Sequence, residues 1–408
     1  MAGDIKNEET KACKYERPKH EIAEIFSQYG RYFQNTIFSS YEQQKVILDI
    51  CTCRTSFLGG HLYKCDQCDY ERPSYNSCKN RHCPKCQGLS KARWVSARKS
   101  ELLPIGYFHN VFTLPHELNP LIRSNKKKLL NILFKSVSET LLTFSKNNND
   151  GQPGFILVLH TWDQKINEHF HLHGIIPAGF LSKDHKRWIF SNDKYLFPVQ
   201  CLSAVFRGKF LDYLKQSFKK KELKLCGQSQ ELESENCFKK LLDTLYKKSW
   251  VVYCKRPFAS PERIIEYLGN YTHRVAISNH RILSTDNGKI KFKYKYRRNG
   301  SETKETMELN AKEFMRRFLL HVLPSGFMRI RHYGFLCNRA KKKLLPICLS
   351  LLGAVPVTKE DICSEVLLKK LTGVELNICP CCKRGHMIQI KELYKQKRSL
   401  EKLFYDTS

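Results

Sequence analysis

The chain has 408 residues, of which 41% are hydrophobic, so it is long enough for two or three domains with buried cores. Its 70 lysines and arginines exceed its 39 acidic residues by 31, which favours nucleic acid as a partner over a basic surface that serves only solubility. The polar start of the chain and the lack of a long apolar run argue against a secreted or membrane-spanning protein. We therefore expect a cytoplasmic, nucleoid-associated protein.

The first third of the chain is rich in metal-binding side chains. Two Cys-x-x-Cys pairs, Cys65/Cys68 and Cys83/Cys86, are separated by fourteen residues, which is close to the spacing of a four-thiolate zinc ribbon. We predict one structural zinc ion here, since cysteines in a reducing cytosol are more often metal ligands than disulfides. Residues 51–86 also contain Cys53, and they allow a second zinc ion held by some of Cys51, His61, Cys78 and His82.

Residues 101–330 alternate between strand-like and helix-like patterns. Residues 107–114 predict a strand and residues 126–145 an amphipathic helix. Two β-rich segments, 155–161 and 170–176, are joined by a short polar link and predict a hairpin. Further along we expect a polar linker at 227–236, helices at 201–220, from Pro261 and at 311–322, and strands at 250–254, 275–283 and 289–297. This mixture favours an α+β fold with an antiparallel sheet.

The second strand of the predicted hairpin carries alternating histidines. On a strand, His171 and His173 point to the same side, where they supply two metal ligands. The opposing strand should bring a third ligand, for which Gln164 is the candidate and Glu168 and His169 are competitors. Two nitrogens and one oxygen suit Mg²⁺ or Mn²⁺ better than zinc. Ordinary packed histidines are the alternative, but their alternation beside an apolar strand argues against it.

The helix that Pro261 opens carries two tyrosines. Tyr267 and Tyr271 are four residues apart, so both phenols lie on one helix face. A phenol has a pKa near 10 and attacks poorly unless a cation, such as the metal ion or Arg274, stabilises the phenolate. A tyrosine that displaces the 3′ hydroxyl keeps the phosphate as an ester, which suits strand transfer rather than degradation.

Basic and aromatic residues alternate in residues 291–298, which suits phosphate contact beside base stacking. Basic residues also surround the cysteine pairs, so the zinc module is a predicted DNA-positioning surface. The candidate DNA-binding residues are Arg81, Arg274, Lys291, Lys293, Lys295 and Arg297.

Several motifs, which occur in order between residues 20 and 340, resemble the insertion-sequence-ninety-one family of transposases. Residues 60–87 resemble its amino-terminal zinc-binding module, and the other matching segments are 107–116, 160–164, 169–173 and 267–278. The resemblance implies a rolling-circle transposase of the HUH endonuclease class, with an antiparallel sheet and flanking helices preceded by a small zinc-binding domain. It implies that His171, His173 and Gln164 bind a divalent ion. It also implies that Tyr267 and Tyr271 nick single-stranded DNA, or hairpin ends, of a mobile element.

The resemblance divides the chain into a zinc-binding domain at 1–100, a nicking domain at 101–330 and a basic C-terminal region at 331–408. The C-terminal region ends in a tail that reads Cys379-Pro-Cys-Cys382-Lys383 where the family more often has Cys-Pro-x-Cys-Gly. This tail is either half a zinc knuckle that needs distant partners, such as Cys363 or His386, or a cluster of reduced cysteines. Two other functions remain open, a replication initiator or relaxase with the same chemistry and a non-enzymatic, zinc-dependent regulator that binds nucleic acid.

Overall fold

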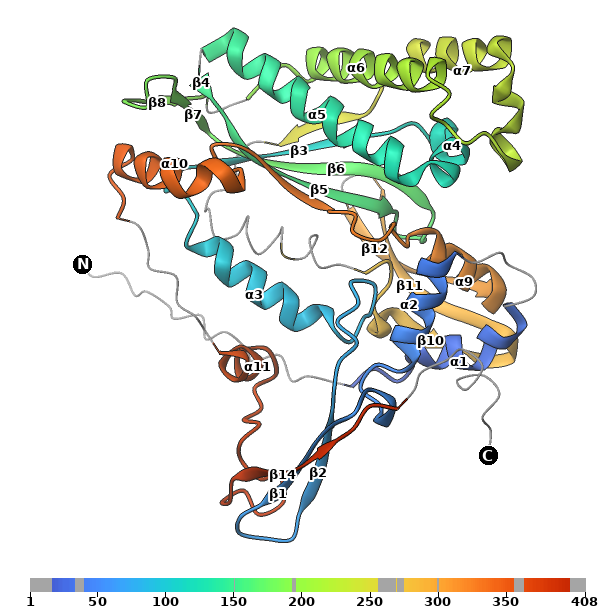
Figure 1. Cartoon of the computed structure of the whole chain (residues 1–408), viewed down its shortest axis with the longest axis vertical. Coiled ribbons are helices and arrows are strands. Elements are labelled where there is room, and N and C mark those ends of the chain that lie inside the picture. The colour runs from blue at the N-terminus through green and yellow to red at the C-terminus, as the bar shows by residue number, and fades with distance from the viewer. Residues whose placement is uncertain are drawn as a thin grey trace.

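The computed structural model describes residues 17–33, 40–149, 151–192, 196–255, 269, 275–298, 301–355 and 363–396. These residues form a mixture of helices and antiparallel sheets, so the predicted α+β class is confirmed (Figure 1). Among the described helices, none combines the length and the apolar character of a bilayer-spanning segment.

A five-stranded antiparallel sheet has the order β13-β5-β6-β3-β9. Its centre is the predicted hairpin, formed by β5 (Gly154–Trp162) and β6 (Glu168–Pro177). β3 (Tyr107–Thr113) and β9 (Val252–Lys255) follow β6, and both match predicted strands. The sequence did not predict β13 (Ile330–Gly334), because its residues include no apolar run.

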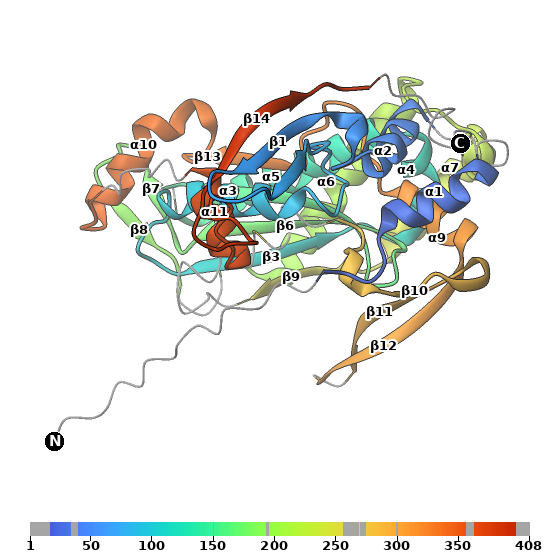
Figure 2. The ribbon, with the colours of Figure 1, turned by 90° about the horizontal axis from the view of Figure 1, so that it is seen from below.

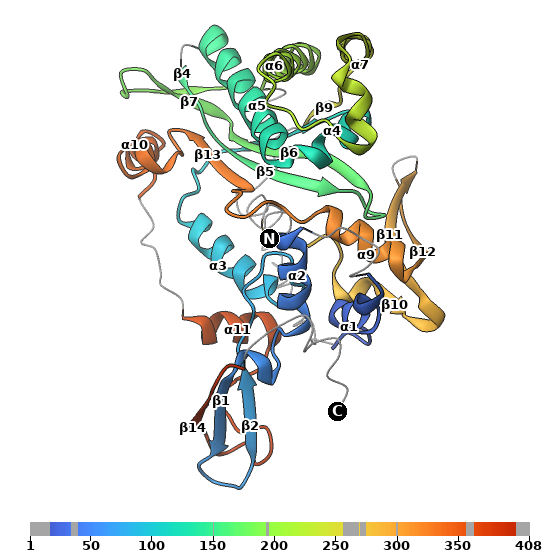
Figure 3. The same ribbon diagram turned by 45° about the vertical axis from the view of Figure 1, so that its right-hand side comes forward.

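The two faces of this sheet pack against different helices. Leu157, Leu172 and Phe112 lie in a large core with α5 (Lys126–Asn149) and α6 (Val199–Lys219), which run along one side of the sheet (Figure 3). Val158 and Ile175, on the opposite face, share a core with α10 (Asn338–Leu351). We call these the α5 face and the α10 face. Every residue of β5 is buried, as expected for a strand covered on both sides.

A hairpin from the first fifth of the chain and a strand from near its C-terminal end meet in a second, smaller sheet. β1 (Gly60–Cys65) and β2 (Glu71–Tyr75) form a hairpin, and β14 (Met387–Leu393) pairs with the other edge of β1 (Figures 1 and 2). α3 (Gln87–Lys99) begins beyond this sheet and extends toward the five-stranded sheet. Near the end of α3, Arg98 Nη1 lies 3.3 Å from His332 Nε2 on β13.

A second core joins the N-terminal helices to a hairpin from late in the chain. α1 (Ile22–Phe33) and α2 (Tyr41–Cys51) pack with α9 (Ala311–Leu320), where the rings of Phe26 and Phe318 meet edge-on at 5.3 Å. The same core includes residues of β10 (Ile282–Ser284) and β11 (Lys289–Arg298), and β12 (Ser301–Asn310) pairs along the whole of β11.

The strand predicted over residues 275–283 is largely wrong. Only its last two residues belong to β10, and residues 279–281 form a 3₁₀ turn. The buried Asn279 side chain accepts a hydrogen bond from the Ile22 backbone amide at 3.2 Å, which ties this segment to the start of α1. The apolar residues Ala276 and Ile277 are therefore buried in the core that includes α1 and α9, not in a sheet.

Shorter elements complete the described part of the chain. The linker predicted at 227–236 contains a 3₁₀ turn followed by α7, whose residues Phe238, Leu242 and Leu245 are buried at helical spacing. The remaining elements are α4 (Asn119–Ser124), β4 (Gly151–Gln152), β7 (Gly179–Ser182), β8 (Trp188–Phe190), α7 (Glu235–Lys247) and α11 (Ser364–Thr372).

Candidate functional site

Three histidines meet on the α10 face of the central sheet, near the turn between β5 and β6. His160 on β5 is directly opposite His171 on β6, and His173 lies two residues further along β6. Residues opposite each other in antiparallel strands share a face, as do residues two apart on one strand. The three histidines are buried, and one ring nitrogen from each lies within 4.8 Å of the others.

Hydrogen bonds orient the imidazole rings toward a common point. His171 Nδ1 donates to the carbonyl oxygen of His169 at 2.9 Å. His173 Nδ1 lies 2.9 Å from Nε2 of His109, a buried residue of β3. The Nε2 atoms of His171 and His173 face each other at 3.2 Å. A hydrogen bond at Nδ1 fixes the tautomer whose Nε2 lone pair can bind a metal ion.

Trp162 fixes the ring of His160 at the end of β5. The two rings stack at a centroid distance of 5.1 Å and an angle of 16°. The pairing with β6 shifts between these two residues, which is a bulge of the kind that redirects side chains beside functional sites. Trp162 also packs against the ring of buried His321, whose Nε2 lies 3.2 Å from the carbonyl oxygen of Ile166. His160 is therefore supported by a packed and hydrogen-bonded turn.

The histidine group is electrostatically suited to a cation. Burial, together with smaller effects of the neighbouring His169 and His109, lowers the pKa of His171 to about 3. His171 is therefore neutral at pH 7. A metal ion needs unprotonated imidazole ligands, so the burial that disfavours a proton leaves the lone pair available to the ion. Three converging imidazole nitrogens fit a divalent metal ion.

The histidine group does not contain Gln164, the residue expected as the third ligand. Gln164 lies in the turn beyond β5, where its backbone carbonyl accepts a hydrogen bond from Arg281 Nη2 at 2.5 Å. Glu168 accepts hydrogen bonds from Arg123, and His169 is exposed at the start of β6. His160 is the residue that joins His171 and His173. Counting the hairpin register back from His171 would have identified it.

The predicted nucleophiles, Tyr267 and Tyr271, and the predicted phenolate partner Arg274 lie outside the described residues. Gly269, between the two tyrosines, is described and is helical. It lies against α3 so closely that a Cβ atom added to it would be 2.4 Å from Cγ2 of Val95.

Eight cysteines form two four-thiol groups, and the grouping differs from the one expected. Cys83 and Cys86 join Cys53 and Cys78 at the start of α3, and we call these four the α3 cysteine group. Cys65 and Cys68 do not join them and instead lie beside Cys379 and Cys382, with which they form the tail cysteine group. Neither group includes Cys51, His61 or His82.

The α3 cysteine group has the dimensions of a zinc site. Its Sγ atoms are 3.5 Å apart for Cys53 and Cys86 and 3.6 Å apart for Cys78 and Cys86. Four thiolates at the usual zinc–sulfur distance of about 2.3 Å would be about 3.8 Å apart at the corners of a tetrahedron. Cys51 is excluded because it ends α2, where its thiol points to the carbonyl oxygen of Ala23 at 3.7 Å.

The predicted DNA-binding residues lie in two places. Arg81 is half-buried and donates to the carbonyl oxygen of Phe327 at 2.6 Å, so it also has a structural role. Lys291, Lys293 and Lys295 are exposed on one face of β11, and Arg297 follows them on that strand. The opposite strand partly neutralises this face, since Lys295 forms an ion pair with Glu302 at 2.5 Å.

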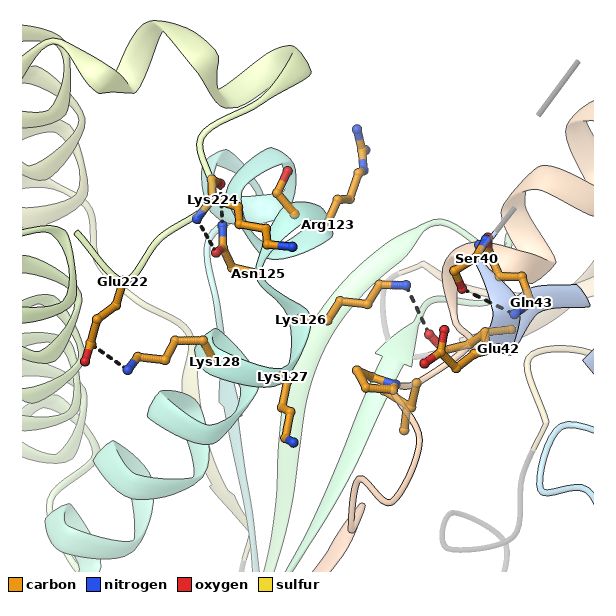
Figure 4. Close-up of a pocket in the computed structure, with 14 residues that line it drawn as sticks. Ser40, Glu42, Gln43, Arg123, Asn125, Lys126, Lys127, Lys128, Glu222 and Lys224 are labelled. Carbon is orange, nitrogen blue, oxygen red and sulfur yellow. Dashed lines mark hydrogen bonds and ion pairs between the residues drawn. The ribbon is translucent and has the colours of Figure 1, made fainter. Parts of the chain in front are cut away.

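A basic pocket of about 590 Å³ adds a cationic surface that the sequence did not predict (Figure 4). Lys126 reaches across it and donates to the carbonyl oxygens of Leu320 and Val322, at 2.7 and 3.1 Å. Burial lowers the pKa of Lys126 to about 8, so this residue is still mostly charged at neutral pH. The cations that line the pocket are Arg123, Lys126, Lys127, Lys128 and Lys224.

The pocket is connected to the strand of the histidines. Arg123, on its rim, donates from Nε to a carboxylate oxygen of Glu168 at 2.6 Å. Glu168 is the first residue of β6 and precedes His171 by three residues. Glu168 therefore links the pocket to the strand that carries His171 and His173.

Two family models match this chain. Residues 25–114 match a model described as "Transposase zinc-binding domain", which contains the whole α3 cysteine group, and residues 154–343 match one described as "Putative transposase". The second range includes the three histidines. No solved structure matches the chain.

Two curated relatives resemble nearly the whole chain. It is 42% identical over 379 residues to "Putative transposase y4qJ" of Sinorhizobium fredii, a match that covers 91% of this chain and 95% of the relative. It is 25% identical over 342 residues to "Transposase for insertion sequence element IS801" of Pseudomonas savastanoi pv. phaseolicola, with 83% and 81% covered. The chain therefore belongs to the insertion-sequence-ninety-one (IS91) family of transposases.

Proposed function

We propose that this transposase nicks single-stranded DNA at the ends of a mobile element and keeps the cut strand on a tyrosine. The observation that carries the proposal is the convergence of His160, His171 and His173 on one face of the central sheet. Burying three polar imidazole rings costs free energy, which a bound metal ion would offset. In a protein that acts on DNA, a divalent ion beside the scissile phosphate is the chemically useful occupant.

The donor set indicates which ions would fit. Three imidazole nitrogens are a poor match for Mg²⁺, which prefers oxygen ligands, and a better match for Mn²⁺ or another transition metal ion. Bound there, the ion would polarise a non-bridging phosphate oxygen. His160, His171 and His173 would hold it, and the hydrogen bonds of His171 and His173 at Nδ1 would keep their Nε2 atoms directed at it.

The nucleophiles that we propose are Tyr267 and Tyr271. Attack by one phenolic oxygen forms a bond to phosphorus and breaks the bond from phosphorus to the 3′ oxygen, which leaves with a proton as a free hydroxyl. The 5′ phosphate stays on the tyrosine, and a target hydroxyl can reverse the step without ATP. Gly269 supports this role, because its contact with Val95 would anchor to α3 the segment that contains both tyrosines.

The basic pocket offers a route for the DNA strand. A phosphate there would meet Arg123, Lys127 and Lys224, and Arg123 binds Glu168 at the start of the strand that carries His171 and His173. Arginine and lysine contacts to phosphate position a strand without reading its sequence. We propose that the strand passes from this pocket over the β5–β6 turn to the histidine group.

Covalent capture of labelled DNA tests this function. Wild-type protein is incubated with Mn²⁺ and a single-stranded oligonucleotide that carries the element's terminal sequence, and a denaturing gel is examined for an adduct. We expect an adduct with wild-type protein and none with Tyr267→Phe/Tyr271→Phe, whereas Tyr246→Phe, which alters an exposed tyrosine of α7, should retain it.

The same assay tests the histidines. His171→Ala should lose cleavage at least 100-fold and still bind the oligonucleotide, whereas His116→Ala, at an exposed position, should cleave normally. An adduct that persists in the double tyrosine variant would place the nucleophile elsewhere. Normal cleavage by His171→Ala would refute the metal assignment, whereas the absence of an adduct with wild-type protein would favour a non-enzymatic regulator.

A further inference from the structure

The small sheet formed by β1, β2 and β14 combines an N-terminal hairpin with a strand from near the C-terminal end of the described chain. β14 pairs antiparallel with β1, so that Cys65 is opposite Met387 and Gly60 is opposite Leu393. In two views β14 lies beside β1, although more than 300 residues separate them in sequence (Figures 1 and 2). β2 covers only the other edge of β1, so the tail supplies a third of this sheet.

Two Cys-x-x-Cys turns face each other at one end of this sheet. Cys65 is the last residue of β1 and Cys68 lies in the turn that follows it, whereas Cys379 and Cys382 lie in a turn before β14. The Sγ atoms are 3.7 Å apart for Cys65 and Cys382 and again 3.7 Å apart for Cys68 and Cys379. These distances match the edge of about 3.8 Å that a tetrahedron of zinc-bound thiolates requires.

The backbone of both turns is arranged around the sulfur atoms. The amide of Gln67 donates to Cys65 Sγ at 3.4 Å, and the amide of Gly385 donates to Cys382 Sγ at 3.3 Å. Such N–H···S bonds stabilise negatively charged thiolates. A Cβ atom at Gly385 would lie 2.5 Å from Cys65 Sγ, so only glycine lets the tail approach this closely.

Apolar packing is too small to hold this sheet together. Its buried cluster contains only Cys65, Cys379 and Met387, with a few half-buried neighbours, among the residues that the structure describes. A three-stranded sheet with so few buried side chains needs another source of stability, and a structural metal ion is the usual one. Two of the three buried residues are themselves cysteines of the group.

We propose that Cys65, Cys68, Cys379 and Cys382 bind one structural zinc ion that fastens the tail to the β1–β2 hairpin. Residues 379–382 lie outside both matched family models, which end at residues 114 and 343. The protein would then hold two structural zinc ions. The ion at the α3 cysteine group would connect residues that are close in sequence, whereas the ion at the tail cysteine group would connect segments more than 300 residues apart.

Zinc content of the purified protein tests this proposal without any DNA. Measured by mass spectrometry of the metal, wild-type protein should contain two structural zinc ions per chain, one for each cysteine group. Cys65→Ser/Cys68→Ser and Cys379→Ser/Cys382→Ser should each contain one. The quadruple variant should also contain one, because both pairs belong to the same site. Cys381→Ser, which alters the exposed third cysteine of the tail, is the matched control and should retain two.

A quadruple variant that loses two ions, or a tail variant that keeps both, would overturn the proposal.

Alkylation of wild-type protein gives a second readout that does not depend on how the variants fold. Cys65, Cys68, Cys379 and Cys382 should all resist alkylation and become reactive together when a chelator is added, whereas Cys381 should react at once. Reaction of Cys379 and Cys382 before Cys65 and Cys68 would refute a shared ion. Neither readout depends on DNA cleavage, so this proposal and the proposed function can fail separately.

Discussion

His109 connects the histidine group to a third strand of the central sheet. Its Nε2 atom is 2.9 Å from Nδ1 of His173, and the two rings stack with an angle of 9° between them. With a metal ion on Nε2 of His173, the ring proton would be on Nδ1, and this N–H would donate a hydrogen bond to Nε2 of His109. A partner of this kind fixes the ring orientation and raises the basicity of the ligand. We therefore propose that His109 is a positioning residue, which the sequence does not distinguish from a packed histidine.

His109→Ala should therefore weaken metal binding and leave DNA binding unchanged. Loss of such a partner costs roughly 10- to 100-fold in metal affinity. The Mn²⁺ concentration that gives half-maximal adduct formation should rise by that factor, and adduct formation at saturating Mn²⁺ should recover. His109→Gln should restore part of the affinity, because its carboxamide oxygen can accept the same hydrogen bond. An unchanged Mn²⁺ requirement in His109→Ala would contradict the positioning role.

α3 runs from the α3 cysteine group to Gly269, which lies between the two proposed nucleophiles in sequence. It begins directly after Cys86, and Val95 on its later half lies against Gly269. A zinc ion at Cys86 would thus fix the start of the helix that Gly269 contacts. Under the proposed function, this connection would give the zinc-binding region a role in the geometry of cleavage.

Gly269→Ala tests this connection. The added Cβ would lie 2.4 Å from Cγ2 of Val95, so one of the two segments must move. Adduct formation should fall about 10-fold or more, since misplacement of a reacting group by about 1 Å can cost 10²-fold. Val95→Ala removes the clashing methyl group and should restore activity in the double variant. The control is Gly208→Ala on α6, where a Cβ would meet open space. A fully active Gly269→Ala protein would show that this contact does not matter.

Helices and strands could be predicted from the sequence where the spacing of apolar residues indicated them. The hairpin of β5 and β6, with β3 and α5, follows from apolar periodicity, and His171 and His173 follow from strand alternation. His160 required the hairpin register, which depends on the length of the turn and on the bulge before Trp162. β12 was missed because nearly all of its residues are polar and exposed, so its only signal is its pairing with β11.

The cysteine groups show what the sequence could not predict at the scale of the whole molecule. Spacing correctly identified the Cys-x-x-Cys pairs as metal-binding candidates, but the partner of Cys65 and Cys68 lies more than 300 residues away. Sequence proximity favoured Cys83 and Cys86, whereas β14 brings Cys379 and Cys382 to the site. Long-range pairing of this kind is set by tertiary structure and leaves no local pattern.

The net charge of +31 makes a prediction for the whole protein. Binding to single-stranded DNA should weaken steeply with salt, because each neutralised phosphate releases counterions. Lys293 and Lys295 allow a matched comparison, since Lys293 faces the neutral Thr306 across the strands whereas Lys295 forms an ion pair with Glu302. Lys293→Gln should reduce the slope of log affinity against log salt by about 1, as expected for one lost phosphate contact. Lys295→Gln should reduce it less, because Glu302 already neutralises part of that charge. Fluorescence anisotropy between low and moderate salt measures both slopes, and two unchanged slopes would show that the β11–β12 hairpin does not contact DNA.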